Sequence, residues 1–167
     1  AIDKERKSMN PLVVGQAAKK IASLAQIKVP EDTRILLAEI DGVGPEYPLS
    51  REKLSPILAF YTVADYDQGI RRCEDMTEFG GLGHSAVIHS NDEMVIREFG
   101  TRVRTGRLLV NCPSAQGAIG DIYTNNNPSL TLGCGSMGRN STTANVSVEN
   151  LLNVKRLDLR RVNMMWF

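Results

Sequence analysis

Four short runs of apolar residues alternate with stretches of helical periodicity, and this alternation constrains the fold more than any other feature of the sequence. The run over residues 34–40 is too continuous in apolar residues for a half-exposed strand and short enough for a buried one. Further strands of this kind are expected at residues 56–63, 85–89 and 107–111. Buried strands that alternate with helices predict an α/β fold, here a three-layer αβα lobe around a largely parallel sheet.

Three helices are expected before and between these strands. A helix over residues 10–24 begins with an Asn-Pro pair, which combines a capping side chain with a residue suited to the first helical position. A second helix is predicted over residues 65–79, and the glycine pair that follows would end it. A third begins at residues 90–93, which have the spacing of a capping box.

Composition limits the partners of the chain. Its 167 residues carry 20 basic and 19 acidic side chains, so the net charge of +1 gives no electrostatic signature for nucleic acid or an anionic membrane. No uninterrupted apolar run approaches the roughly 18 residues of a membrane span, and the N-terminus does not resemble a signal peptide. We therefore expect a cytoplasmic chain of one domain, with no nucleic-acid and no membrane partner.

The cysteines and histidines are few and scattered. Cys73, Cys112 and Cys134 are odd in number and form no CxxC pair, so we expect neither a disulfide framework nor a bound metal. His84 follows a Gly-Gly-Leu-Gly loop where the chain enters a strand, and both a functional role and an ordinary surface turn are open for it. For His89, at the end of a strand, we expect no function.

Residues 112–145 form a glycine-rich stretch with little periodicity, and we expect it to be a site loop. Residues 133–138 match GxGxxG, but the residues that follow favour turns over the helix that a dinucleotide site requires. A glycine-rich turn near a site is therefore the favoured interpretation. Cys134 could be a thiolate with His84 as its base, but a small cysteine in a tight loop is the simpler reading.

Two clusters of basic residues are expected to be solvated faces, with phosphate contact to a nucleotide or to coenzyme A as the alternative. The second cluster has no interleaved aromatic residue. The first consists of Arg97, Arg102, Arg104 and Arg107, and the second of Lys155, Arg156, Arg160 and Arg161.

Four segments of the chain, residues 52–58, 79–84, 111–121 and 128–136, resemble the CoA-acylating aldehyde dehydrogenases. These are the aldehyde dehydrogenase part of bifunctional aldehyde–alcohol dehydrogenases and their monofunctional relatives. The resemblance covers essentially the whole chain and implies that residues 1–167 are part of a catalytic domain. It also implies that a short aldehyde, NAD and coenzyme A are converted to acyl-CoA through a cysteine thioester. The enzyme would be a homo-oligomer, in the cytoplasm or a bacterial microcompartment, and about residues 154–167 would take part in oligomerisation.

The resemblance also assigns roles to individual residues. Glu52 would accept hydrogen bonds from the ribose hydroxyls next to the nicotinamide. Leu54 would lie beside the nicotinamide, at a position where many relatives have phenylalanine. His84 would be an auxiliary acid or base in the coenzyme A step. Cys134 matches a cysteine that is not the nucleophile, within a substrate loop that consists of Gly133, Cys134, Gly135 and Ser136.

The resemblance further implies that the nucleophilic cysteine and the Rossmann domain lie before the segment that begins this chain. The chain alone would then be inactive, and Ala1 and the pair Trp166–Phe167 would be cut edges of a larger enzyme. Two alternatives remain open. One is a non-catalytic binding or assembly module of the same fold, and the other is a small acyltransferase that uses Cys134 and His84.

Overall fold

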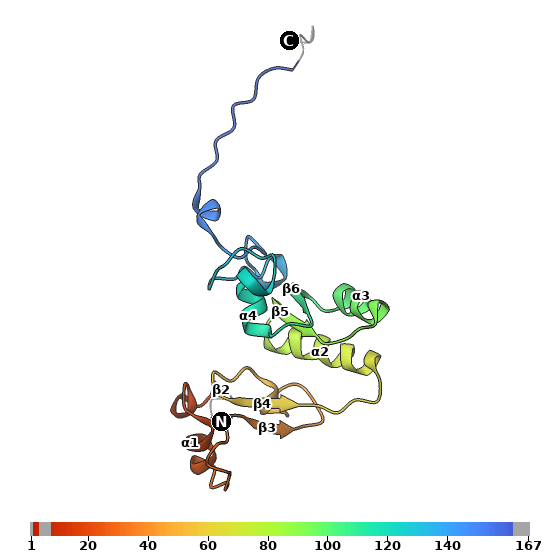
Figure 1. Ribbon diagram of the computed structural model, residues 1–167. Coiled ribbons are helices and arrows are strands. Elements are labelled where there is room, and N and C mark those ends of the chain that lie inside the picture. The colour runs from red at the N-terminus through yellow and green to blue at the C-terminus, as the bar shows by residue number, and fades with distance from the viewer. Residues whose placement is uncertain (1, 4–7, 162–167) are drawn as a thin grey trace.

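The computed structural model describes residues 2–3 and 8–161 and arranges them in two groups, which residues 61–65 connect (Figure 1). Ala1, Trp166 and Phe167, which we expected to be cut edges of a larger enzyme, lie outside the described residues. In chain order the elements are β1 (Ile2–Asp3), β2 (Ser8–Met9), α1 (Ala18–Leu24), β3 (Leu36–Glu39), β4 (Ile57–Phe60), α2 (Tyr66–Gly80), β5 (Gly83–Ile88), α3 (Glu93–Arg102), β6 (Thr105–Val110) and α4 (Ser114–Ile119). Short 3₁₀ helices cover Pro11–Val13, Pro48–Ser50, Asp121–Tyr123, Ser136–Gly138 and Val148–Leu151.

The α/β class and the parallel arrangement of the four main strands are confirmed. β3 pairs in parallel with β4, with Leu36 opposite Ile57, and β5 pairs in parallel with β6, with Ala86 opposite Leu108. The expectation of one sheet is wrong for the described residues, because these strands form two separate two-stranded sheets. A third, antiparallel pair joins β1 and β2.

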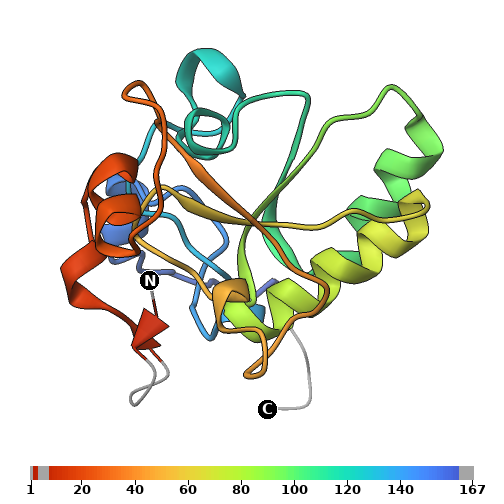
Figure 2. The ribbon, with the colours of Figure 1, turned by 90° about the horizontal axis from the view of Figure 1, so that it is seen from below.

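The β5–β6 sheet has helices on both faces. On one face Ile70 of α2 and Phe99 of α3 are buried and form a cluster that Leu108 packs against. On the other face α4 contacts both strands, and Gly117 lies against the side chain of Leu109. Seen from below, α2 and α3 lie together on one side of the molecule and α1 lies on the other (Figure 2). The expected three-layer arrangement therefore describes this half of the chain.

The β3–β4 pair differs from the buried strands that its sequence predicts. Ile57 is buried against Val13 and Ile21, which lie before and within α1. The opposite face is open: Leu37 is 64% exposed, Leu58 49% and Phe60 48%. Alternate side chains of a strand point to opposite faces, so an apolar run is buried throughout only when both faces are covered. Among the described residues only one face of this pair has a cover.

The helix boundaries correct two expectations. The helix predicted over residues 10–24 is divided, because Gly15 takes a positive φ of 66° between the 3₁₀ helix Pro11–Val13 and α1. The capping box expected at residues 90–93 does not form, since α3 begins only at Glu93. Its cap is Asp92, whose carboxylate accepts hydrogen bonds from the N–H groups of Met94 and Val95.

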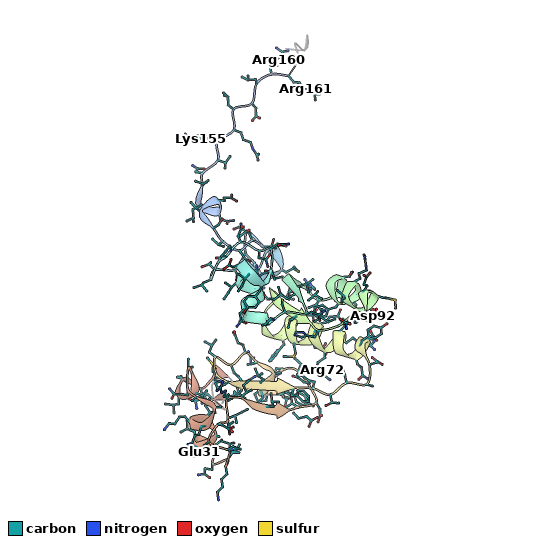
Figure 3. All side chains as sticks on the ribbon, in the orientation of Figure 1. Glu31, Arg72, Asp92, Lys155, Arg160 and Arg161 are labelled. Carbon is teal, nitrogen blue, oxygen red and sulfur yellow. The ribbon has the colours of Figure 1, made fainter. Side chains whose placement is uncertain are left out.

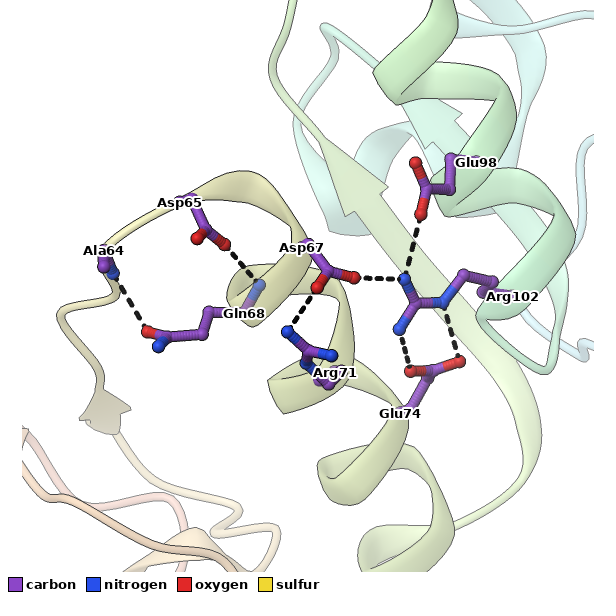
Figure 4. Close-up of polar contacts among 8 residues, drawn as sticks. All are labelled: Ala64, Asp65, Asp67, Gln68, Arg71, Glu74, Glu98 and Arg102. Atoms are coloured by element: carbon purple, nitrogen blue, oxygen red, sulfur yellow. Dashed lines mark hydrogen bonds and ion pairs between the residues drawn. The ribbon is translucent and has the colours of Figure 1, made fainter.

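Arg102 joins α3 to α2 through two carboxylates of α2 and also pairs with one of α3, which corrects the expectation that it lies on a solvated face (Figure 4). Its guanidinium contacts Glu74 at 2.6 and 3.1 Å, Asp67 at 2.6 Å and Glu98 at 3.0 Å. Hydrogen bonds from Arg102 lower the pKa of both Asp67 and Glu74. Arg71 pairs with Asp67 within α2, and the two pairs of Arg102 with Asp67 and Glu74 connect the helices, so the charges form a small network.

The chain beyond the 3₁₀ helix Val148–Leu151 extends away from both groups of elements (Figure 1). Leu157 and Leu159 are 88% and 83% exposed. The expected solvated face of the second basic cluster is confirmed, since its side chains are exposed along this extension (Figure 3). A role in oligomerisation for about residues 154–167 stays a prediction, and residues 162–167 lie outside the described part of the chain. No helix in that part is long and apolar enough to cross a membrane.

We expect Arg102→Met to lower the thermal stability of the protein near neutral pH. The carboxyls of Asp67 and Glu74 have a lowered pKa in the folded state, so their stabilising effect is present above their unfolded pKa values of about 4. It is lost as the pH falls through the lower, folded values. The difference in melting temperature between wild type and variant should therefore shrink between about pH 5 and pH 3.

The matched control is Arg97→Met, which removes an exposed arginine from the same helix. It should change the melting temperature little over this pH range. A constant difference between wild type and Arg102→Met from pH 7 to pH 3 would contradict the role given to the charge network.

Candidate active site

The candidate site is a cavity of about 550 Å³ between the two groups of elements. Glu52 and Lys53 line it on the side of the β3–β4 pair, and His84, Thr105 and Cys134 line it on the side of β5 and β6. The structure thus brings three of the sequence-predicted residues, Glu52, His84 and Cys134, to one cavity. They come from three segments that lie far apart in the chain.

A second cavity, of about 380 Å³, lies along α2 and the end of α3. Its lining includes Arg71, Glu74, Arg102 and Glu78, and these guanidinium and carboxylate groups already pair with each other or with their neighbours. Because its charged groups are satisfied inside the protein, we place the candidate site in the larger cavity.

His84 is the second residue of β5, and two glycines set its position. Gly81 ends α2 with a φ of 143°, and Gly83 has a φ of 89°, a conformation that favours glycine. The N–H of Gly83 donates to the carbonyl oxygen of Arg104 at 2.9 Å, which starts the pairing of β5 with β6. The exposed side chain of His84 lies directly after this start, at the cavity wall.

The loop that carries Cys134 lies against β5 because glycines leave room for it. A Cβ on Gly83 would overlap the carbonyl oxygen of Cys134, and one on Gly138 would overlap the Cβ of Cys134. The N–H of Cys134 donates to the side chain of Asn140 at 3.0 Å, which closes the turn. The turn expected at residues 133–138 is confirmed: a 3₁₀ turn occupies Ser136–Gly138, and no helix covers residues 139–145.

The rest of the expected site loop, residues 112–145, contains one regular helix that the sequence analysis missed. α4 covers Ser114–Ile119 after Pro113 and ends at Gly120, which has a φ of 95°. Asn145 ties the later part of the loop to this helix. Its buried amide donates to the carbonyl oxygens of Ala118 at 2.9 Å and Ile119 at 3.1 Å, and to a third carbonyl, that of Asn127, at 2.9 Å.

Arg107 is the functional candidate that sequence reasoning placed wrongly. We expected it on a solvated face, but its side chain is buried under the loop, and the residue is only 5% exposed. Its Nη2 donates to the carbonyl oxygens of Gly133 at 2.6 Å and His84 at 3.3 Å, and its Nη1 donates to that of Thr143 at 2.9 Å. Burial lowers the pKa of Arg107.

A sequence signal for this burial does exist. Positions 105, 107 and 109 share one face of β6, and Leu109 on that face is buried. An arginine at the middle position of a buried face must find its hydrogen-bond acceptors inside the protein. Because Arg107 was grouped with the neighbouring arginines, its place on the buried face of the strand was not recognised.

The opposite wall of the cavity follows the 3₁₀ helix Pro48–Ser50. Glu52 is exposed there, whereas the amino group of Lys53 donates to the carbonyl oxygens of Leu49 and Arg51, the latter at 2.7 Å. Burial lowers the pKa of Lys53. Leu54, expected beside the nicotinamide, does not line the cavity: it is 56% exposed, and its N–H donates to the Sδ of Met9.

The other residues of the expected substrate loop and the other two cysteines do not line the cavity. Gly133 and Gly135 are buried behind Cys134, and Ser136 is exposed beside it. All three cysteines are free thiols, and Cys134 is the one that lines the cavity. Burial raises the pKa of Cys73 on α2, which packs against the cluster that contains Phe99 and Val103.

The chain is similar in sequence and in structure to one segment of aldehyde dehydrogenases, and no family model matches it. It is 50% identical over 159 residues to aldehyde-alcohol dehydrogenase 2 of Entamoeba histolytica and 51% identical over 158 residues to the aldehyde-alcohol dehydrogenase of Streptococcus pneumoniae. Each match covers 95% of this chain and 18% of the relative. The crystal structure of an acetylating aldehyde dehydrogenase from Geobacillus thermoglucosidasius matches 95% of this chain and 35% of its own, with a TM-score of 0.88 and 44% identity.

We expect Gly83→Ala to displace the loop from β5, because the new Cβ would overlap the carbonyl oxygen of Cys134 and the positive φ would be strained. Strain of about 1–3 kcal/mol should lower the melting temperature by several degrees. The rate at which iodoacetamide alkylates Cys134 should change as well. Gly80→Ala is the control, since its Cβ would meet nothing within 4 Å. Equal behaviour of the two variants would contradict this packing.

Proposed function

Because the chain corresponds to one segment of the acylating aldehyde dehydrogenases, we propose that it forms one wall of an active site that converts an aldehyde and coenzyme A to acyl-CoA. The observation that carries this proposal is the convergence of Glu52, His84 and Cys134 on one cavity. The balanced reaction takes aldehyde, NAD⁺ and coenzyme A to acyl-CoA, NADH and one proton. The chain spans 18% of the length of these relatives, so we assign it a part of the site rather than the whole.

The described residues fit one end of the dinucleotide. When bound, NAD⁺ accepts the hydride from the carbon of the aldehyde. The carboxylate of Glu52 is exposed at the cavity, and a carboxylate that is free to accept two hydrogen bonds suits a pair of ribose hydroxyls. The turn at residues 133–138 has no helix behind it to bind the pyrophosphate. We therefore propose that another part of the protein holds the remainder of the dinucleotide.

His84 is proposed to act in the transfer to coenzyme A. Its imidazole would accept the proton of the coenzyme A thiol, and the resulting thiolate would attack the carbonyl carbon of the enzyme thioester. The new carbon–sulfur bond forms as the bond to the enzyme cysteine breaks, and that cysteine leaves as a thiolate. Because His84 is exposed, it can release the accepted proton to solvent.

The cysteine that carries the acyl group is proposed to come from another part of the protein. The Sγ of Cys134 contacts the carbonyl oxygen of Leu132 at 4.0 Å, and in the described part of the chain it makes no hydrogen bond with His84. The shared cavity nevertheless favours one alternative, an acyltransferase in which Cys134 is the nucleophile. Mass analysis of peptides after reaction with an acyl-CoA separates the two: an acyl group on Cys134 would support the alternative, and one on a cysteine outside this chain would support the proposal.

We expect His84→Gln, in the product of the complete gene that encodes this chain, to slow the coenzyme A step. Loss of a general base lowers such a step by about 100-fold or more. The burst of NADH formed from aldehyde without coenzyme A should keep its amplitude. His89→Gln is the control, because His89 lies just beyond β5 and does not line the cavity. A His84→Gln variant with normal turnover would rule out the role proposed for this histidine.

We expect Glu52→Gln to raise the KM for NAD⁺ by about tenfold, since hydrogen bonds to a charged group contribute about 1.5–3 kcal/mol. The KM for coenzyme A should change less. Steady-state kinetics with each substrate varied in turn measures this difference. Glu46→Gln provides the comparison, because Glu46 is exposed in the preceding loop and does not line the cavity. An identical effect of both substitutions would show that the Glu52 carboxylate has no specific role.

A further inference from the structure

Arg107 is the one buried residue with a charged side chain among those that the structure describes. Moving a charge out of water is costly unless it is paired or fully hydrogen-bonded. No ion pair of Arg107 with a carboxylate occurs among the described residues. Its charge is instead satisfied by neutral oxygens.

The guanidinium has five N–H groups, and five oxygens accept from it. Three are the backbone carbonyls of His84, Gly133 and Thr143, at 3.3, 2.6 and 2.9 Å. The other two are side-chain oxygens, of Ser85 at 3.2 Å and Asn145 at 3.5 Å. A lysine has only three N–H groups and no planar fork, so it could not contact all of these oxygens.

The acceptors of Arg107 lie on strand β5 and on the loop that carries Cys134, which together form this wall of the cavity. His84 and Ser85 lie on β5, whereas Gly133 and Thr143 lie on the two arms of the loop that carries Cys134. Arg107 itself lies on β6, next to β5. One side chain therefore connects the strand with His84 to the loop with Cys134.

We propose that Arg107 is a positioning residue that holds His84 and Cys134 together at the cavity wall for the coenzyme A step. This inference rests on the function proposed above for His84. Arg107 acts through the backbone of its neighbours rather than by contact with a substrate. The contribution comes from the five-donor fork, so a positive charge alone does not replace it.

The test uses Arg107→Lys in the product of the complete gene, with Arg104→Lys as the matched control. Arg104 is exposed, precedes β6 and lies 3.8 Å from Glu78, so its substitution leaves the cavity wall intact. For Arg107→Lys we expect coenzyme A-dependent turnover to fall by about tenfold or more, while the NADH burst without coenzyme A keeps its amplitude. A merely structural role would reduce burst and turnover in the same proportion, and that result would overturn the proposal.

A second readout does not depend on activity. The rate at which iodoacetamide alkylates Cys134, followed by peptide mass, should change at least threefold in Arg107→Lys and not in Arg104→Lys. An unchanged rate would show that Arg107 does not set the position of this loop. If His84→Gln leaves turnover normal, the proposed function fails, and the alkylation rate still decides whether Arg107 positions the wall.

Ser85→Ala provides a milder variant in case Arg107→Lys does not fold. It removes the acceptor of the Nε–H group of Arg107 and leaves the other four acceptors in place, at the cost of a small change at the cavity wall, which Ser85 also lines. We expect a reduction in coenzyme A-dependent turnover of about two- to threefold, with an unchanged NADH burst. No change in turnover and no change in alkylation of Cys134 would count against the proposal.

Discussion

The hydrogen bonds of Arg107 are the interaction on which the cavity wall depends. Residues 133–145 contain only a short 3₁₀ turn and an isolated bridge between Leu132 and Asn145, so regular secondary structure does little to fix them. The guanidinium of Arg107 holds the loop in place, because it donates hydrogen bonds to carbonyl oxygens on both arms of the loop. Glycines complete the arrangement, since a side chain at Gly83 would prevent the loop from reaching β5.

The two groups of elements contribute differently to the site. The β5–β6 half has helices on both faces and a charge network between α2 and α3, so it holds its wall firmly. The other half supplies Glu52 and Lys53 from a segment between a 3₁₀ helix and β4. The hydrogen bonds of Lys53 to backbone carbonyls fix that segment, and they leave the carboxylate of Glu52 at the cavity.

The sequence predicted what depends on local periodicity and missed what depends on tertiary contacts. The four main strands and helices α2 and α3 follow from apolar spacing, and the turn at residues 133–138 follows from its glycines and polar neighbours. The division into two sheets and the open face of Leu58 depend on which layers cover each strand, and a single sequence does not state this. The resemblance supplied Glu52, His84 and Cys134 as site residues, but only the fold brings them to one cavity. Arg107 was misjudged because its charge was considered before its place on a buried face.

The distance along the chain between the two walls has a consequence for the order of folding. The unit from β5 to β6 closes over a short stretch of chain, so its contacts cost little loop entropy and can form early. The cavity needs the segment around Glu52 to meet the loop around Cys134, and that meeting comes after the local units exist. We therefore expect the site to be among the last regions to become ordered during folding and among the first to open when stability is reduced.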